Sequence, residues 1–318
     1  MSSKRRSTVA DYLIYLAVRV IICAIQILPY PTARRFARFL GRILYRINRR
    51  HRKVALENLR HAYPELGEEE RDQLVRKCYI HLCTLIIDML FLPRLMSVRN
   101  RRKYLLMPDG DLLMDAVLGE KPVLLVTGHH GNWEVSSWIL GLTFPSYSIA
   151  RTIDNPFLDR LVRQFRERTR QRILAKRGEL DRIESVLASG GVLGTLADQD
   201  AGSKGQFVEF FGRPASTHKA VALLAMEHNV KMVVVSTSWI ENREVRGEWV
   251  GSPGRYQVLI EDIIDPDEYK DRPDAIKAIT ERYTAALERL IRVTPEQYFW
   301  VHRRWKSEPR KRKPRKAG

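Results

Sequence analysis

A histidine and a glutamate five residues apart have the types and the spacing in this 318-residue chain that suit general-base chemistry. They are His129 and Glu134, in a string that reads His-His-Gly-Asn-Trp-Glu and follows an apolar run at 123–126. The apolar run predicts a buried strand, and open α/β sheets place their chemistry at the carboxyl ends of strands. A carboxylate that fixes the imidazole tautomer and stabilises the imidazolium lets the other ring nitrogen take a proton. The pair therefore predicts a general base.

The nucleophile that this base activates is expected to belong to a substrate. No Ser or Cys nucleophile motif of the form Gly-x-Ser-x-Gly accompanies the pair, so a substrate hydroxyl is the natural recipient of the base. The alternative is a strand-end histidine that is only hydrogen-bonded, since a short motif is a hypothesis. The whole six-residue string, rather than the histidine alone, favours the catalytic interpretation.

That string resembles the His-x4-Asp/Glu motif of acyltransferases. In the form His-x-Gly-Asn-Trp-Glu it is similar to the motif of the bacterial lipid A late acyltransferases, the lauroyl and myristoyl transferases. The resemblance implies that His129 is the base, that Glu134 is its partner, and that His130 fills a variable position. It also places Asn132 among the residues expected to bind substrate.

A second specific match lies near the end of the chain. Residues 295–306 read Pro-Glu-Gln-Tyr-Phe-Trp-Val-His-Arg-Arg-Trp-Lys and closely resemble the terminal signature of the same family. Between the two matches the family has an Arg followed by Asn-Pro, then Asp-x-Asp-x-Gly and a Phe-rich run. This chain has comparable blocks at 151–156, 198–202 and 205–212.

Three side chains in or near these blocks, Arg151, Arg166 and Asp200, are expected at the substrate. Arg151 and Asp200 follow predicted strands, and Arg166 lies in the helix after Arg151. Arginines at such places can grip a phosphate or steady an oxyanion, although a charge-rich helix face needs no function. The paired Asp residues could hold the acceptor, shape the site or suggest a divalent metal, and we expect neither metal nor cofactor because no further ligand cluster is evident.

The hydropathy pattern predicts an α/β fold with a central mixed sheet flanked by helices. The family resemblance implies that this fold is similar to that of the glycerolphosphate acyltransferases. The Phe-rich run at 205–212 is expected to line a groove for the acyl chain. The alternative is that its phenylalanines belong to the hydrophobic core. Strands are expected at 121–127, 147–150, 192–197, 230–240 and 256–261, and helices at 54–92, 110–119, 179–189, 217–229 and 274–293.

The N-terminal 50 residues are expected to anchor the chain to a membrane. Residues 12–30 are an apolar run of the length that a bilayer span requires, although Arg19 at its middle is costly there. We expect this helix to span or to insert steeply, with a buried soluble helix as the alternative. Residues 33–50 form a basic amphipathic helix, typical of the headgroup plane of a cytoplasmic leaflet. The alternative for this second helix is that it packs on the protein core and its charged face is solvated.

The distribution of charge supports a membrane partner. Of the net charge of +18, residues 1–53 carry +12 and residues 302–318 carry +8, which leaves the body at −2. A nearly neutral body argues against a nucleic-acid-binding domain and favours an anionic membrane surface. We divide the chain into anchoring helices (1–50), an acyltransferase domain (51–306) and a basic, disordered tail (307–318). Three cysteines without metal or disulfide spacing fit a reducing compartment.

The resemblance implies a membrane-associated O-acyltransferase at the cytoplasmic side of the inner membrane. It would move an acyl chain from acyl carrier protein, an acidic donor that basic segments can guide, to a hydroxyl of a lipid A precursor. One alternative is a relative that acylates another membrane glycolipid or phospholipid from acyl-CoA. An alternative of another class is an inactive membrane-surface binding protein, against which the intact His129 and Glu134 pair speaks.

Overall fold

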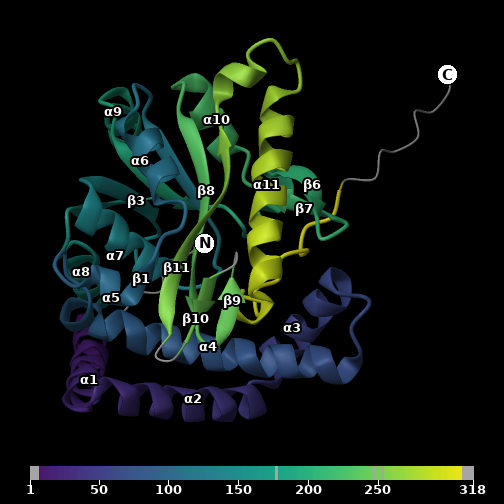
Figure 1. Cartoon of the computed structure of the whole chain (residues 1–318). Helices are drawn as coiled ribbons and strands as arrows, with labels where there is room; N and C mark the ends of the chain where they lie inside the picture. The colour runs from purple at the N-terminus through teal and green to yellow at the C-terminus, as the bar shows by residue number, and fades with distance from the viewer. Residues whose placement is uncertain (1–6, 176–177, 246–247, 252–253, 310–318) are drawn as a thin grey trace.

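The computed structural model describes residues 7–175, 178–245, 248–251 and 254–309. Its central sheet consists of β1 (Leu105–Leu106), β2 (Val123–Thr127), β3 (Ser146–Ala150), β4 (Gln171–Ala175), β5 (Val192–Leu196), β8 (Lys231–Ile240) and β11 (Arg255–Ile264). These seven strands lie in the order β1-β11-β8-β2-β5-β3-β4 (Figure 1). Strands β8 and β11 are antiparallel, and the other neighbours are parallel. The predicted mixed sheet is thereby confirmed.

Helices cover both faces of this sheet. In the described residues they are α1 (Thr8–Ile27), α2 (Tyr30–Ile47), α3 (Arg49–Ala62), α4 (Glu68–Leu95), α5 (Arg101–Tyr104), α6 (Gly110–Leu118), α7 (Trp133–Thr143), α8 (Pro156–Arg166), α9 (Leu180–Ala188), α10 (Ala220–Glu227) and α11 (Ala275–Val293). Successive residues of a strand point to opposite faces. Leu124 and Val126 accordingly pack in one core with α9, α10 and α11, whereas Val123 and Leu125 pack in another with α4, α6 and α7.

Two hairpins lie outside the central sheet. One pairs β6 (Gln206–Phe210) with β7 (Arg213–Thr217), and the other pairs β9 (Arg243–Val245) with β10 (Glu248–Val250). The Phe-rich run therefore forms a strand and its turn. Phe210 and Phe211 are buried in a core that includes Tyr63 and Trp300, so this run is core and does not line the cavity described below. The edge strand β4 was also missed, since its short polar start shows no apolar run.

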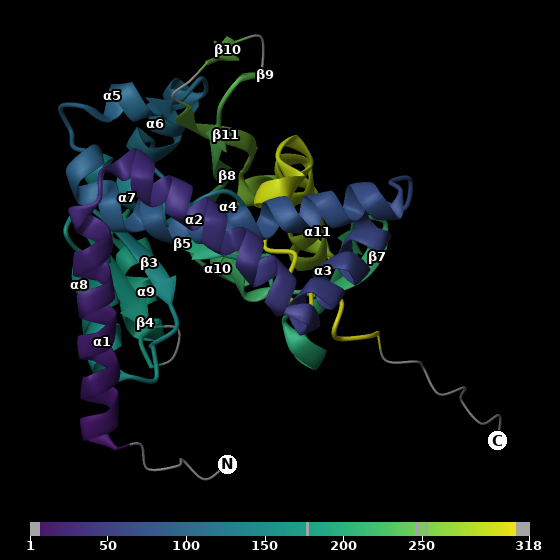
Figure 2. The same ribbon diagram turned by 90° about the horizontal axis from the view of Figure 1, so that it is seen from below.

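The first helices form a layer under the sheet. Both views place α2 along α4, with α1 beside them at the same side of the molecule (Figures 1 and 2). Helix α2 meets α4 through the small residues Ala33, Ala37 and Gly41, which are buried, while Phe36 and Phe39 are exposed on its outer face. In the described residues α1 and α4 are long and apolar enough to cross a membrane, and α4 is the more buried of the two.

The proposed division into segments stays a prediction. Helix α2 contacts the body closely, and its exposed phenylalanines fit the expected membrane-facing role better than a charged face packed on the core. Of the predicted C-terminal tail, residues 310–318 lie outside the described residues.

The close approach of α2 to α4 generates a stability prediction. A Cβ at Gly41 would lie 2.6 Å from the Ile80 Cα, a backbone atom that cannot yield without moving the helix. Gly41→Ala gains about 1 kcal/mol of helix propensity but should lose more than this by overpacking, which typically costs about 1–3 kcal/mol. Thermal unfolding in detergent micelles should show a lower midpoint. Arg42→Ala, on the exposed side of the same helix, is the control and should change little; an unchanged midpoint for Gly41→Ala would contradict the tight contact.

Candidate active site

The register of two neighbouring parallel strands brings His129 together with Asp198. In the pairing of β2 with β5, Thr127 lies opposite Leu196. His129 and Asp198 therefore each lie two residues beyond a paired position. Because parallel strands end at the same edge of a sheet, the two side chains leave that edge next to each other.

The imidazole and the Asp198 carboxylate form a close, largely buried pair. His129 Nδ1 lies 2.8 Å from Asp198 Oδ1, and the His129 backbone N–H donates to Asp198 Oδ2 at 2.9 Å. The histidine side chain is 21% exposed and the aspartate side chain 3%. Gly128 makes this approach possible, since a Cβ there would lie 3.1 Å from Asp198 Cγ. The carboxylate holds the ring proton on Nδ1 and leaves Nε2 as the acceptor.

The electrostatics of the pair strengthen the affinity of His129 for a proton and keep Asp198 ionised. Burial lowers the pKa of His129, but the charge and hydrogen bond of Asp198, with a smaller contribution from Glu134, outweigh burial and raise the pKa above its ordinary 6.5. Burial raises the pKa of Asp198, whereas the His129 charge and hydrogen bonds lower it further, to about 2. The pair can thus accept a proton at Nε2 and stabilise the imidazolium that results.

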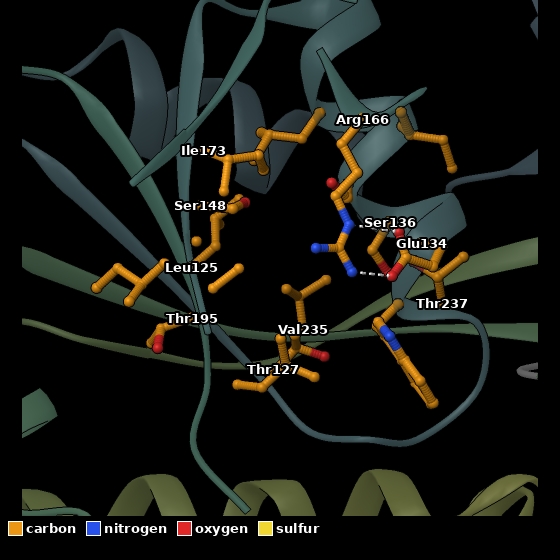
Figure 3. Close-up of a pocket in the computed structure, with 18 of the residues that line it drawn as sticks. Leu125, Thr127, Glu134, Ser136, Ser148, Arg166, Ile173, Thr195, Val235 and Thr237 are labelled. Carbon is orange, nitrogen blue, oxygen red and sulfur yellow. Dashed lines mark hydrogen bonds and ion pairs between the residues drawn. The ribbon is translucent and has the colours of Figure 1, made fainter. Parts of the chain in front are cut away.

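Glu134 has a different partner from the predicted one. Its carboxylate accepts two hydrogen bonds from Arg166, with Nε to Oε2 at 3.0 Å and Nη2 to Oε1 at 2.5 Å (Figure 3). Glu134 lies in the first turn of α7, which packs beside α8 and so presents the carboxylate to Arg166. The expected direct contact between Glu134 and the His129 ring is thereby corrected: the ring nitrogen Nδ1 bonds Asp198, and Glu134 acts on His129 only through its charge.

A cavity of about 370 Å³ lies beside both pairs. His129, Glu134 and Arg166 are part of its wall, and Figure 3 shows Glu134 and Arg166 across the space from Leu125 and Thr195. Apolar side chains from the sheet and from α6 and α7 extend the wall inward. They include Leu113, Leu125, Ile139, Leu140, Phe144, Ile149, Ile173, Val235 and Val258. The cavity therefore combines the two ion pairs with a lining that is largely apolar, and this apolar part is called its apolar depth below.

Gln199 lies at the reactive side of the histidine. Its Nε2 is 3.4 Å from His129 Nε2, and its side chain lines the cavity. Since Nδ1 faces a carboxylate, Nε2 is the acceptor in this contact and the amide donates. Trp133 and Phe299 pack around the same ring, with ring centroids 5.0 Å and 5.8 Å from that of His129. The histidine is thus held between aromatic walls with Nε2 directed at a polar group.

The other predicted substrate-binding residues lie in three different settings. Arg151 lines the cavity with an 83% exposed side chain that pairs loosely with Asp154 at 3.4 Å. Asn132 is buried, where it caps α7 by accepting from the Val135 backbone N–H. Asp200 accepts from the backbone and hydroxyl of Ser307 and from Gly202, away from the lining of the cavity. The structure brings Arg151 and Arg166 to the cavity, and gives Asn132 and Asp200 contacts within the protein.

Sequence reasoning missed Asp198 and Gln199 as neighbours of the base. Both lie in the Asp-Gln-Asp block that was noted, but the second aspartate of that block was selected. The available signal was the position of Asp198, which lies just beyond the end of a predicted strand, as His129 does. The sequence alone does not show that β2 and β5 are neighbours in the sheet.

A model of the family described as bacterial lipid A biosynthesis acyltransferase matches residues 1–307. The chain belongs to this family. It is an acyltransferase. Its similarity to the lipid A biosynthesis lauroyltransferase of Escherichia coli is 26% identity over 303 residues, covering 94% of this chain and 92% of that protein.

Two further relatives have the same extent. A lipid A biosynthesis acyltransferase of Haemophilus influenzae is 26% identical over 93% of this chain and 90% of its own length. The lipid A biosynthesis palmitoleoyltransferase of Escherichia coli is 23% identical over 89% of this chain and 87% of its own. Among solved structures, a 1-acyl-sn-glycerophosphate acyltransferase from Thermotoga maritima is 14% identical with a TM-score of 0.38, over 80% of this chain and 97% of that one.

In this acyltransferase the terminal signature closes the loop that carries His129. The backbone N–H of Phe299 donates to the His129 carbonyl and that of Gly131 donates to the Gln297 carbonyl, each at 3.0 Å. Gly131 has a positive φ of 61°, and a Cβ there would lie 2.1 Å from the Thr237 carbonyl oxygen, so a glycine is required. Arg304 is 2% exposed and donates to the Ser216 carbonyl at 2.6 Å. The signature is therefore a structural strap across the site.

His130 is a buried structural histidine beneath the base. Its ring nitrogens contact the hydroxyls of Ser236 and Thr294, both at 2.8 Å. Burial, the largest influence, lowers its pKa to about 4. His81 is half-buried; its Nε2 donates to the Gly131 carbonyl at 2.9 Å, and desolvation of the ring lowers its pKa to about 4. Both rings are neutral in the folded protein at neutral pH.

The pair of His129 and Asp198 predicts the pH profile of the enzyme. His129 must be unprotonated to act as a base, so kcat/KM should rise with pH through a midpoint above 6.5. Asp198→Asn removes the charge that raises this pKa and stabilises the imidazolium. It should lower the rate by about 10²–10⁴ and move the midpoint of the residual activity to lower pH. Asp200→Asn is the matched control and should keep the midpoint; an unshifted midpoint in Asp198→Asn would contradict the assigned partner.

The neutral histidines predict acid sensitivity of the fold. Their folded pKa of about 4 lies below the ordinary 6.5, so the unfolded chain binds protons that the folded one does not. The contribution of these two rings to the free energy of unfolding is then fully present above about pH 6.5. It is lost as pH falls toward 4, by up to about 1.4 kcal/mol per pH unit for each ring. His130→Phe should flatten this dependence and, at pH 7.5, should cost about 1–3 kcal/mol because two buried hydroxyls lose their partner. Urea unfolding at pH 7.5 and pH 5 measures both effects, and equal stability at the two pH values would be the contrary result.

Proposed function

We propose that this acyltransferase moves a fatty acyl chain from the thioester of acyl carrier protein to a hydroxyl of a lipid A precursor. The observation that carries the proposal is the convergence of two ion pairs, His129 with Asp198 and Arg166 with Glu134, on one cavity with an apolar depth. The relatives named for lauroyl and palmitoleoyl transfer support the acceptor class.

His129 acts as the general base of the reaction. Its Nε2 takes the proton of the acceptor hydroxyl as the oxygen attacks the thioester carbonyl. The tetrahedral intermediate then expels the thiolate of the donor, and His129 returns the proton to that sulfur. The new ester forms on the acceptor without an acyl-enzyme, and Asp198 stabilises the imidazolium between the two proton transfers.

Arg166 supplies the positive charge at the site. Its guanidinium lines the cavity and is fixed by two hydrogen bonds to Glu134, so it needs little rearrangement to meet the developing oxyanion or a phosphate of the acceptor. Glu134 is thus assigned to positioning Arg166, with a smaller electrostatic effect on the His129 pKa.

The apolar depth of the cavity is assigned to the acyl chain. Its lining from β2, β8, α6 and α7 contains aliphatic and aromatic side chains over most of its surface. At the mouth, the exposed guanidinium of Arg151 is available to a phosphate of the acceptor. The acyl donor binds with its reacting thioester next to His129 and Arg166.

The site of action is assigned to the cytoplasmic face of the inner membrane. Helix α1 is apolar, and α2 carries exposed phenylalanines among arginines, a composition suited to an anionic lipid surface. The acidic acyl carrier protein reaches such a site from the cytoplasm, where the basic segments of the chain favour its approach.

The experiment that tests the function follows a labelled acyl chain from acyl carrier protein to a lipid A precursor. His129→Ala should nearly abolish transfer, by about 10²–10⁴, in a protein that still folds and binds membrane. Retention of transfer by His129→Ala would remove it as the base. Substituting acyl-CoA, or a different acceptor lipid, tests the donor and acceptor separately.

The role of Glu134 is decided by a double-mutant cycle with Arg166. If Glu134 acts by positioning Arg166, then Arg166→Gln alone and the double variant with Glu134→Gln should lose similar activity, because the two residues act as one unit. If Glu134 instead orients His129, the losses should multiply. The readout is kcat/KM of acyl transfer, with His129→Ala as the inactive reference.

A further inference from the structure

Helix α1 contacts the catalytic body at its N-terminal end. Asn155, which begins α8, donates through Nδ2 to the Asp11 carbonyl at 2.9 Å, and both residues are buried. The Tyr12 ring lies edge-on to Phe157 of α8, with their centroids 5.3 Å apart. The first turn of α1 is thus fixed to the helix that carries Arg166.

The same helix contacts the body at its C-terminal end. Gln26 Nε2 donates to the Leu90 carbonyl at 2.8 Å, and Arg94 Nη1 donates to the Gln26 carbonyl at 2.6 Å. Between the ends, the less exposed residues of α1 recur at helical spacing, at Asp11, Tyr15, Val18, Ile22 and Gln26. One stripe of the helix therefore faces the body along its whole length.

These contacts are incompatible with a helix that leaves the body to cross a bilayer. A 20-residue helix is about 30 Å long, which equals the thickness of the hydrocarbon core. A spanning helix with one end at the body would carry its other end about 30 Å away from it. To keep both contacts while spanning, the start of α8 would have to enter the hydrocarbon with the exposed charges of Arg151, Asp154 and Arg160.

The outer surface of α1 fits an interfacial position. Val9 and Val20 are each 68% exposed on the side away from the body. Arg19, in the middle of the helix, is exposed as well, and an in-plane helix lets it reach the headgroups. In Figures 1 and 2, α1 and α2 lie in one layer on the same side of the molecule, so their exposed apolar residues can enter the same leaflet together.

We propose that α1 does not cross the membrane but lies flat in the lipid headgroup region beside α2, so that residue 7 and the catalytic body are on one side of the bilayer. The proposal rests on the membrane role assigned above and specifies its geometry. Arg151 and Ile153, which line the cavity, precede the Asn155 contact with α1. The mouth of the cavity is therefore next to the embedded helix, and a lipid acceptor enters it sideways from the leaflet.

The topology is tested by labelling with a membrane-impermeant maleimide in spheroplasts of a Gram-negative host. Cys23 is exposed and is replaced by Ser, while Cys78 and Cys83 are buried and are retained. Ser7→Cys reports on the start of α1, and Ser189→Cys, exposed after α9, reports on the body. Each variant is first shown to retain acyl transfer.

The expected result is that both cysteines are protected in intact spheroplasts and labelled after lysis. Labelling of Ser7→Cys alone, or of Ser189→Cys alone, in intact spheroplasts would show that α1 spans and would overturn the inference while leaving the enzymatic proposal in place. Labelling of both in intact spheroplasts would support the inference and would instead refute the cytoplasmic location proposed above.

A second measurement asks directly whether α1 stays on the body in the membrane. The pair Tyr12→Cys with Phe157→Cys, in the same Cys23→Ser background, should form a cross-link in native membranes. The pair Val20→Cys with Phe157→Cys is the control and should not, because Val20 lies on the outer face of α1. Absence of the first cross-link in an active enzyme would mean that α1 leaves α8 in the membrane, which would overturn the proposal.

Discussion

The hydrogen bond between His129 Nδ1 and Asp198 is the interaction on which the site depends. It exists because two parallel strands stop in register, and because Gly128 lets the carboxylate approach the backbone as well as the ring. The same bond selects the tautomer, raises the basicity of the ring and decides which nitrogen faces the cavity. Trp133 and Phe299 restrict the remaining freedom of the ring, so its geometry is set before any substrate arrives.

The two ion pairs share one arrangement, in which the carboxylate supports a nitrogen group that lines the cavity. Asp198 supports His129, and Glu134 supports Arg166. Buried charges are tolerated because each is paired and hydrogen-bonded. The cavity thereby presents nitrogen donors and acceptors to a reaction that develops negative charge on oxygen, in surroundings that are largely apolar.

The sequence predicts the parts of this site that depend on local pattern. The apolar run before His129 indicates a strand, and the six-residue string points to the family and predicts His129 as the base. It does not predict strand order, so it cannot tell that Asp198 lies beside His129. The family motif pairs Glu134 with His129, but its place in the first turn of α7 presents it to Arg166. The strand at 171–175 and the hairpin around Phe210 were missed because short segments with arginine or consecutive aromatic residues show no clear period.

The strap formed by the terminal signature has a consequence for biogenesis. The loop that carries His129 is bonded through the backbone to Gln297 and Phe299, residues that a ribosome synthesises long after that loop. Folding during synthesis proceeds from the N-terminus, so α1 and α2 are available to lipid long before the loop around His129 can be completed. A nascent chain can therefore meet lipid while the loop around His129 is still incomplete, and that loop is completed only after Gln297 and Phe299 have folded back onto it.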